Sequence, residues 1–230
     1  MSGFRPGSRM AILLGLMGGF VLTAGCANLL RWPTAQQTGT YVVQPGDTLY
    51  SIAWRYRLDY RQVANWNRIA PPYLIYPGER LLLRKSGPAL AESSRHRALP
   101  APLAQHQYGG SWVWPAAGTV VGSFSGQGLN GSGINISGQH RETVVAAHAG
   151  RVVYAGSGLP GYGRLIIIRN DPEYLSAYAF NQKIIVQEGM IVQAGQPIAR
   201  MGVRHGQALL HFEIRRDGLP INPVTLLPRR

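Results

Sequence analysis

The chain has 230 residues, of which 45% are hydrophobic, and this length allows one or two small domains with cores of their own. Its single cysteine excludes a framework of internal disulfides. The formal net charge of +13 favours an anionic partner, such as nucleic acid, cell-wall polymer, anionic lipid or an acidic protein.

The first 25 residues have the three parts of a secretory signal peptide. Arg5 and Arg9 precede an apolar run over 10–24, and small residues stand at its end. A transmembrane helix needs about 20 apolar residues, so the alternative to a cleaved signal is a short uncleaved anchor helix. Removing the signal would remove two arginines and no acidic residue, which lowers the net charge from +13 to +11.

The only cysteine lies where the signal peptide is expected to be cut. The stretch 22–26, Leu-Thr-Ala-Gly-Cys, resembles the lipobox of bacterial lipoproteins, although Thr23 replaces the usual aliphatic residue. The resemblance implies lipidation of Cys26, and several acyl chains anchor a protein firmly at about 0.8 kcal/mol per buried methylene. Ala27, by the same resemblance, favours the periplasmic face of the outer membrane. Because an exported lipoprotein rarely meets nucleic acid, we expect cell wall, lipid or protein as the partner.

Shifts in composition divide the rest of the chain into two folded units and two tethers. A polar tether over 26–39 leads into a compact segment over 40–84. A second tether over 85–107 contains several Pro and Ser residues without apolar periodicity, so we expect it to be extended and mobile. The last segment, 108–230, is rich in glycine and in short apolar runs, which predict an all-β domain.

The first unit is predicted to have the order strand, helix, helix, strand. A β-prone run ends at a Pro-Gly pair, and apolar residues then recur at helical spacing. Asp47 or Thr48 can cap the first helix. The predicted elements are a strand over 41–44, helices over 49–56 and 60–67, and a strand over 79–83.

This unit resembles the LysM module throughout, with matching stretches over 41–53, 65–67 and 75–81. The resemblance implies binding of N-acetylglucosamine polymers, here peptidoglycan, in a groove between two loops. The implied glycan-binding residues are Gly46, Asp47, Thr48, Leu49, Ile75, Tyr76, Pro77 and Gly78. Without the resemblance the two Pro-Gly pairs predict only turns. Trp54 and Trp66 are more often core residues than sugar platforms in so small a fold.

The second unit resembles the lysostaphin- or LytM-type zinc peptidases over its whole length. The resemblance implies an antiparallel β-sandwich, so the expected fold class is mostly β with a small α+β module: a LysM βααβ unit followed by a LytM-type domain. In that family a histidine, an aspartate four residues later and the second histidine of a His-x-His pair hold a catalytic zinc. The matching frame comprises 133–136, 144–156, 161–163, 178–179, 189–199 and 210–215.

Most metal-site residues of that family are missing from this sequence. The first histidine falls on Gly131, the aspartate on Asn135, the first member of the pair on Leu209, and a further catalytic histidine on Phe180. Of the ligands only His211 remains. A catalytic zinc needs three protein ligands and one open position, so we expect no metal, no cofactor and no catalytic residue.

Three other histidines are candidates to replace a lost ligand. His140 and His148 are expected at the surface, and His205, just before the strand that carries His211, is the candidate for a displaced ligand. His211 itself has a plainer interpretation as a remaining strand residue that makes one buried hydrogen bond.

The order of lipoprotein signal, LysM module, tether and degenerate LytM-type domain resembles the murein-hydrolase activators. The resemblance implies a non-catalytic protein that activates a periplasmic N-acetylmuramoyl-L-alanine amidase during septal wall splitting and daughter-cell separation. A cleft with neutral or apolar residues in place of charged ones can receive a protein segment. The residues expected to contact the amidase are Asn135, Tyr162, Arg164, Phe180, Arg204, Leu209 and His211.

Two other functions stay open on the sequence alone. The first is a purely structural lipoprotein that links the outer membrane to peptidoglycan. The second is a peptidoglycan endopeptidase with a rearranged zinc site.

Overall fold

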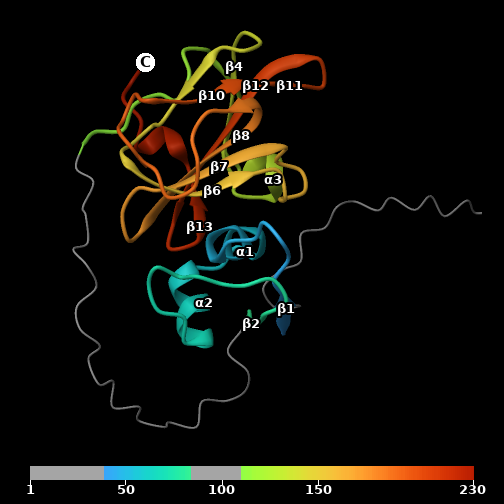
Figure 1. The fold of residues 1–230 in the computed structure, drawn as a ribbon. Coiled ribbons are helices and arrows are strands. Elements are labelled where there is room, and N and C mark those ends of the chain that lie inside the picture. Colours follow the sequence, from blue (N-terminus) through green and yellow to red (C-terminus); the bar gives the residue numbers. More distant parts are fainter. Residues whose placement is uncertain (1–38, 84–109) are drawn as a thin grey trace, which may run out of the picture. The chain divides into compact units, whose positions relative to one another are not determined.

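A computed structural model describes residues 39–83 and 110–230 (Figure 1). All described residues belong to one compact unit of the chain. The predicted signal peptide, Cys26 and the linker over 85–107 lie outside the described residues, as does the first tether apart from Gly39. No helix within the two described ranges is long and apolar enough to cross a membrane.

The first described range folds in the predicted order of strand, helix, helix, strand. The two strands pair antiparallel, with Tyr41 opposite Leu81. Leu49, Ile52 and Val63 are fully buried between the helices and strands. The elements are β1 (Thr40–Val42), α1 (Leu49–Tyr56), α2 (Tyr60–Asn67) and β2 (Arg80–Leu82).

Thr48, rather than Asp47, caps α1. Its hydroxyl accepts a hydrogen bond from the Ser51 backbone N–H at 3.0 Å, and the Ser51 hydroxyl accepts one from the Thr48 N–H at 2.9 Å. This reciprocal pair satisfies two amide groups that the helix cannot bond internally. Asp47 instead accepts hydrogen bonds from the Tyr41 hydroxyl at 2.6 Å and from the Gln44 N–H at 2.9 Å.

Replacing Thr48 by alanine is expected to lower the free energy of unfolding by about 1 kcal/mol, because the first turn of α1 loses its cap. Urea unfolding followed by circular dichroism measures the change. T48S keeps the hydroxyl and is the matched control. An alanine variant as stable as the serine variant would contradict the capping role.

The second described range forms an antiparallel β domain. Its strands run in the order β3-β4-β12-β8-β7-β6-β9, while β10 pairs with β5 and β8, and β11 and β13 pair with β12. The predicted fold class is confirmed: a βααβ module is followed by an antiparallel β-sandwich (Figure 1). The elements are β3 (Val120–Gly122), α3 (Gly128–Gly131), β4 (Ile134–Ser137), β5 (Thr143–Val145), β6 (Gly150–Gly156), β7 (Arg164–Arg169), β8 (Tyr174–Ile184), β9 (Ile191–Val192), β10 (Pro197–Met201), β11 (Val203–Arg204), β12 (Gln207–Arg216), β13 (Leu219–Ile221) and a 3-10 turn (Pro223–Thr225).

Strand β12 lies between β4 and β8 and carries two different rows of side chains. Leu210, Phe212 and Ile214 belong to the main apolar core of the domain. Because successive residues of a strand point to opposite faces, the alternate residues point away from that core. This second row is polar and forms the floor of the candidate site.

Candidate functional site

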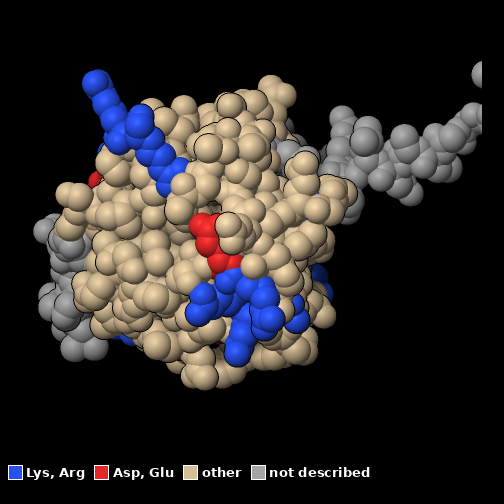
Figure 2. Space-filling model, turned by 90° about the horizontal axis from the view of Figure 1, so that it is seen from above, with Lys and Arg blue, Asp and Glu red and all other residues tan. Residues whose placement is uncertain are grey.

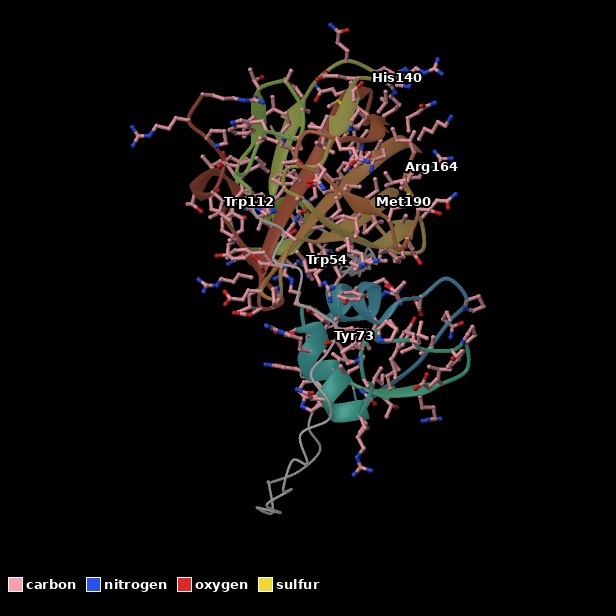
Figure 3. All side chains as sticks on the ribbon, turned by 60° about the vertical axis from the view of Figure 1, so that its left-hand side comes forward. Trp54, Tyr73, Trp112, His140, Arg164 and Met190 are labelled. Atoms are coloured by element: carbon pink, nitrogen blue, oxygen red, sulfur yellow. The ribbon has the colours of Figure 1, made fainter. Side chains whose placement is uncertain are left out.

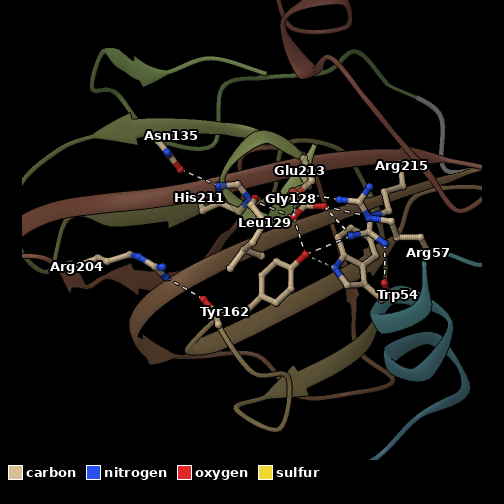
Figure 4. Close-up of polar contacts among 12 residues, drawn as sticks. Trp54, Arg57, Gly128, Leu129, Asn135, Tyr162, Arg204, His211, Glu213 and Arg215 are labelled. Carbon is tan, nitrogen blue, oxygen red and sulfur yellow. Dashed lines mark hydrogen bonds and ion pairs between the residues drawn. The ribbon is translucent and has the colours of Figure 1, made fainter. Parts of the chain in front are cut away.

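His211 is buried and both of its ring nitrogens have partners. Nδ1 lies 2.7 Å from Oδ1 of Asn135 on β4, and Nε2 lies 3.1 Å from Oε1 of Glu213 (Figure 4). Asn135 is paired directly opposite His211 in the β4–β12 register. Both nitrogens therefore face oxygen atoms of neighbouring side chains.

Glu213 and Arg215 continue the row on β12. One Glu213 oxygen accepts hydrogen bonds from the hydroxyls of Ser132 at 2.6 Å and Tyr162 at 2.7 Å. The other accepts from Nε and Nη2 of Arg215 at 3.1 and 3.0 Å. Glu213 is fully buried and Arg215 is 2% exposed, so the charges are paired away from water.

Burial alone would raise the pKa of Glu213, since it disfavours the charged carboxylate. The charge of Arg215 and the hydrogen bonds from His211 and Ser132 outweigh it and lower the pKa to about 2. Burial and the neighbouring Glu213 raise the pKa of Tyr162, which keeps its hydroxyl protonated as a donor. We call the linked residues His211, Glu213, Arg215, Tyr162, Ser132 and Asn135 the buried polar network.

Two other positions that the resemblance assigns to a zinc site, Gly131 and Phe180, carry no metal-binding side chain. A Cβ atom on Gly131 would lie 2.0 Å from Oγ of Ser125, so no side chain fits there without movement. The Phe180 ring lies 5.7 Å from the His211 ring and is covered by the guanidinium of Arg204 at 4.0 Å. Among the described residues no group of three or more His, Cys, Asp or Glu side chains is placed to hold a metal.

Phe180 also has a backbone conformation that is unusual for a bulky residue, with φ of 64°. Hydrogen bonds hold it on both sides: its N–H donates to the Tyr162 carbonyl at 2.9 Å, and its carbonyl accepts from the Gly202 N–H at 3.0 Å. The register of β8 with its neighbours is irregular next to this position.

The structure brings together six of the seven residues expected at the partner groove. Tyr162, Phe180 and His211 are buried, whereas three others are partly exposed: Asn135, Arg204 and Leu209. Arg204 also donates to the Gly161 carbonyl at 2.8 Å. The seventh, Arg164, donates to the Gln182 carbonyl at 2.7 Å and lines a separate cavity of about 290 Å³; Figure 3 shows it at the surface.

The two loops expected to bind glycan meet at the end of β1. The Val43 N–H donates to the Glu79 carbonyl and the Gly78 N–H donates to the Val43 carbonyl, both at 2.9 Å. Tyr76 is 68% exposed, while Leu49 is fully buried. Leu49 therefore supports the loops from the core, and the accessible residues are Gly46, Pro77, Gly78 and Tyr76, with Asp47, Thr48 and Ile75 partly exposed.

Of the remaining histidines, His140 and His205 are exposed, and Figure 3 shows His140 at the periphery. The expectation that His148 lies at the surface is wrong, because the segment before β3 covers it. Its Nε2 lies 2.9 Å from the Gly110 carbonyl, and its ring lies 4.9 Å from that of Trp112.

Both tryptophans expected in the LysM core have partners in the structure. Trp66 is partly buried against the apolar cluster of the module. Trp54 is 1% exposed, but its polar partners are Tyr162 and Arg215 of the β domain. Sequence reasoning also missed Ser132, Glu213 and Arg215 as members of the site; the alternation of charged residues at 211, 213 and 215 was the available signal.

These elements define a class of protein: a LysM module followed by a domain of the M23 peptidase fold. The LysM domain family matches residues 41–84, and Peptidase family M23 matches residues 129–223.

Relatives match across both domains. A lipoprotein NlpD/LppB homologue of Pseudomonas aeruginosa is 40% identical over 237 residues, covering 86% of this chain and 80% of that protein. The uncharacterized lipoprotein YgeR of Escherichia coli is 34% identical over 247 residues, covering 99% and 97%. The murein hydrolase activator NlpD of Salmonella dublin is 33% identical over 267 residues, covering 86% and 71%. The chain belongs to the NlpD/LppB family of lipoproteins.

Proposed function

We propose that this protein is a lipoprotein at the periplasmic face of the outer membrane, anchored through Cys26, that binds peptidoglycan with its LysM module. We further propose that its M23-type domain has no catalytic activity and activates a periplasmic N-acetylmuramoyl-L-alanine amidase during septal wall splitting. The relatives named murein hydrolase activator support this role.

The observation that carries the proposal is the pair of hydrogen bonds on His211. A hydrolytic zinc needs three ligands, and the remaining histidine gives one nitrogen to Asn135 and the other to Glu213. Restoring a zinc site would require freeing a His211 nitrogen from its present contact as well as replacing the missing ligands. The network therefore supports a binding role for the domain.

The module and the surface charge support an anionic wall partner. The Lys and Arg residues number 23 against 10 Asp and Glu. The face drawn in Figure 2 is mostly uncharged, with Lys and Arg side chains in groups and few acidic ones between them. Such an excess favours binding to a polymer that carries carboxylates.

Amidase contact is proposed for the partly exposed residues of the expected partner groove, Asn135, Arg204 and Leu209. Arg204 is the most informative of them, because its guanidinium covers Phe180 and can pair with an acidic side chain of the amidase. Tyr162 and His211 are buried, so they support these residues without being exposed to a partner themselves.

The test measures release of soluble dye from labelled peptidoglycan by a cognate amidase, with and without the purified full chain. We expect release only in the mixture. Dye release by the chain alone would indicate an enzyme. If the chain does not stimulate the amidase in the mixture, the remaining function is that of a structural lipoprotein.

Replacing Arg204 by glutamate is expected to lower amidase stimulation about tenfold, because the change reverses a charge at the proposed contact. R229E is the matched control, since Arg229 is exposed near the C-terminus and outside the cleft. Sedimentation with peptidoglycan should be the same for both variants. Equal stimulation by R204E and R229E would rule out this contact surface.

A further inference from the structure

The end of α1 packs against the candidate site through Trp54. The indole Nε1–H donates to the Tyr162 hydroxyl at 3.0 Å, and the Arg215 guanidinium lies 3.6 Å from the centre of the indole ring (Figure 4). Nη1 of Arg215 also donates to the Trp54 carbonyl at 2.7 Å. A buried stack of arginine on tryptophan with two hydrogen bonds is a specific contact.

Further contacts surround Trp54. Arg57 donates to the Gly128 carbonyl at 3.1 Å, and Arg55 donates to the Gly158 carbonyl at 3.3 Å. Arg61 forms an ion pair with Asp217. The cavity left between the two surfaces is only about 10 Å³, which is about the volume of one water probe. We call this set of contacts the LysM–cleft junction.

The junction touches the same network that occupies the former metal site. Tyr162 and Arg215 bond to Glu213, and Glu213 bonds to His211. His211, Glu213 and Arg215 lie in one row along β12, and Trp54 stands over the Arg215 end of this row. A protein segment laid along the whole row would have to displace Trp54.

We propose that α1 of the LysM module is an intramolecular cover for the cleft, with Trp54 as its central residue, and that an amidase segment competes with it. This inference rests on the proposed function, because the competing partner is the amidase. With the junction closed, the apparent affinity for the amidase is reduced by the fraction of molecules that are open. Opening the junction exposes the Arg215 end of the row and raises that affinity.

The first test replaces Trp54 by alanine in the full chain. We expect hydrogen exchange to rise in β12 and in α1, and amidase stimulation at low activator concentration to rise about tenfold with the same maximum. W54F keeps a ring under Arg215 but loses the N–H donor, so its effect should be smaller.

The second test changes a junction residue of the β domain, Asp217, and applies even if W54A does not fold. D217K repels Arg61 and should increase stimulation in the same direction as W54A. D217N is its control, because asparagine tolerates the backbone φ of 50° at this position and introduces no repulsion.

Each result has a defined meaning. Unchanged hydrogen exchange in folded W54A and D217K would overturn the closed junction. Increased exchange without increased stimulation would overturn the competition. If the unaltered chain and all variants fail to stimulate any amidase, the proposed function fails, and the exchange data still decide whether the junction exists.

Discussion

Replacing Arg215 by methionine is expected to lower the free energy of unfolding by about 3–5 kcal/mol near neutral pH. The change leaves Glu213 charged and buried without its partner, which is the costly way to break a buried ion pair. It also removes the stack on Trp54. Urea unfolding followed by circular dichroism measures the loss.

The neighbouring arginine supplies the control. Arg216 pairs with Glu173 at the surface, so R216M is expected to change stability little. The double variant E213Q/R215M removes both charges and should recover most of the loss. If R215M is as stable as R216M, the Glu213–Arg215 ion pair does not contribute to the free energy of unfolding as described.

Acid is expected to weaken the fold through Glu213. The pKa of this carboxyl is about 2 in the folded state, below its ordinary value of 4.5. A lowered pKa stabilises the fold above the unfolded pKa, and the contribution is lost as the pH falls from about 5 towards 2. The shift corresponds to roughly 3 kcal/mol.

Unfolding free energies of the unaltered chain and of E213Q at several pH values test this expectation. The two should differ most near neutral pH and converge as Glu213 becomes protonated. E173Q, which changes an exposed carboxylate, should follow the unaltered chain throughout. A difference between the unaltered chain and E213Q that stays constant down to about pH 3 would argue against a shifted pKa.

The LysM module could be predicted from the sequence almost to the residue because its signals are local. Pro-Gly pairs mark the turns, a threonine precedes the first helix, and apolar spacing defines both helices. The choice between Asp47 and Thr48 as the cap could not be made, since either side chain can accept the bond.

The contacts within the candidate site could not be predicted from the sequence. The resemblance to the zinc peptidases singles out Gly131, Asn135, Phe180 and Leu209, whereas the buried polar network joins residues that are far apart in the sequence. Glu213 enters the sequence prediction only as part of that frame, although its spacing from His211 places both on one face of β12. The partners of Trp54 could not be predicted from the sequence, because Tyr162 lies 108 residues away along the chain.

Arg215 also completes the end of a helix in the other domain. The Trp54 carbonyl belongs to the last turn of α1, where carbonyl groups carry partial negative charge; it accepts from the Arg57 N–H at 3.2 Å, and Arg215 supplies a second donor. A cation from β12 therefore finishes a helix of the LysM module. Heat that loosens the β domain removes this support, so the two domains should melt together, as a single calorimetric transition, although 26 residues separate their described ranges.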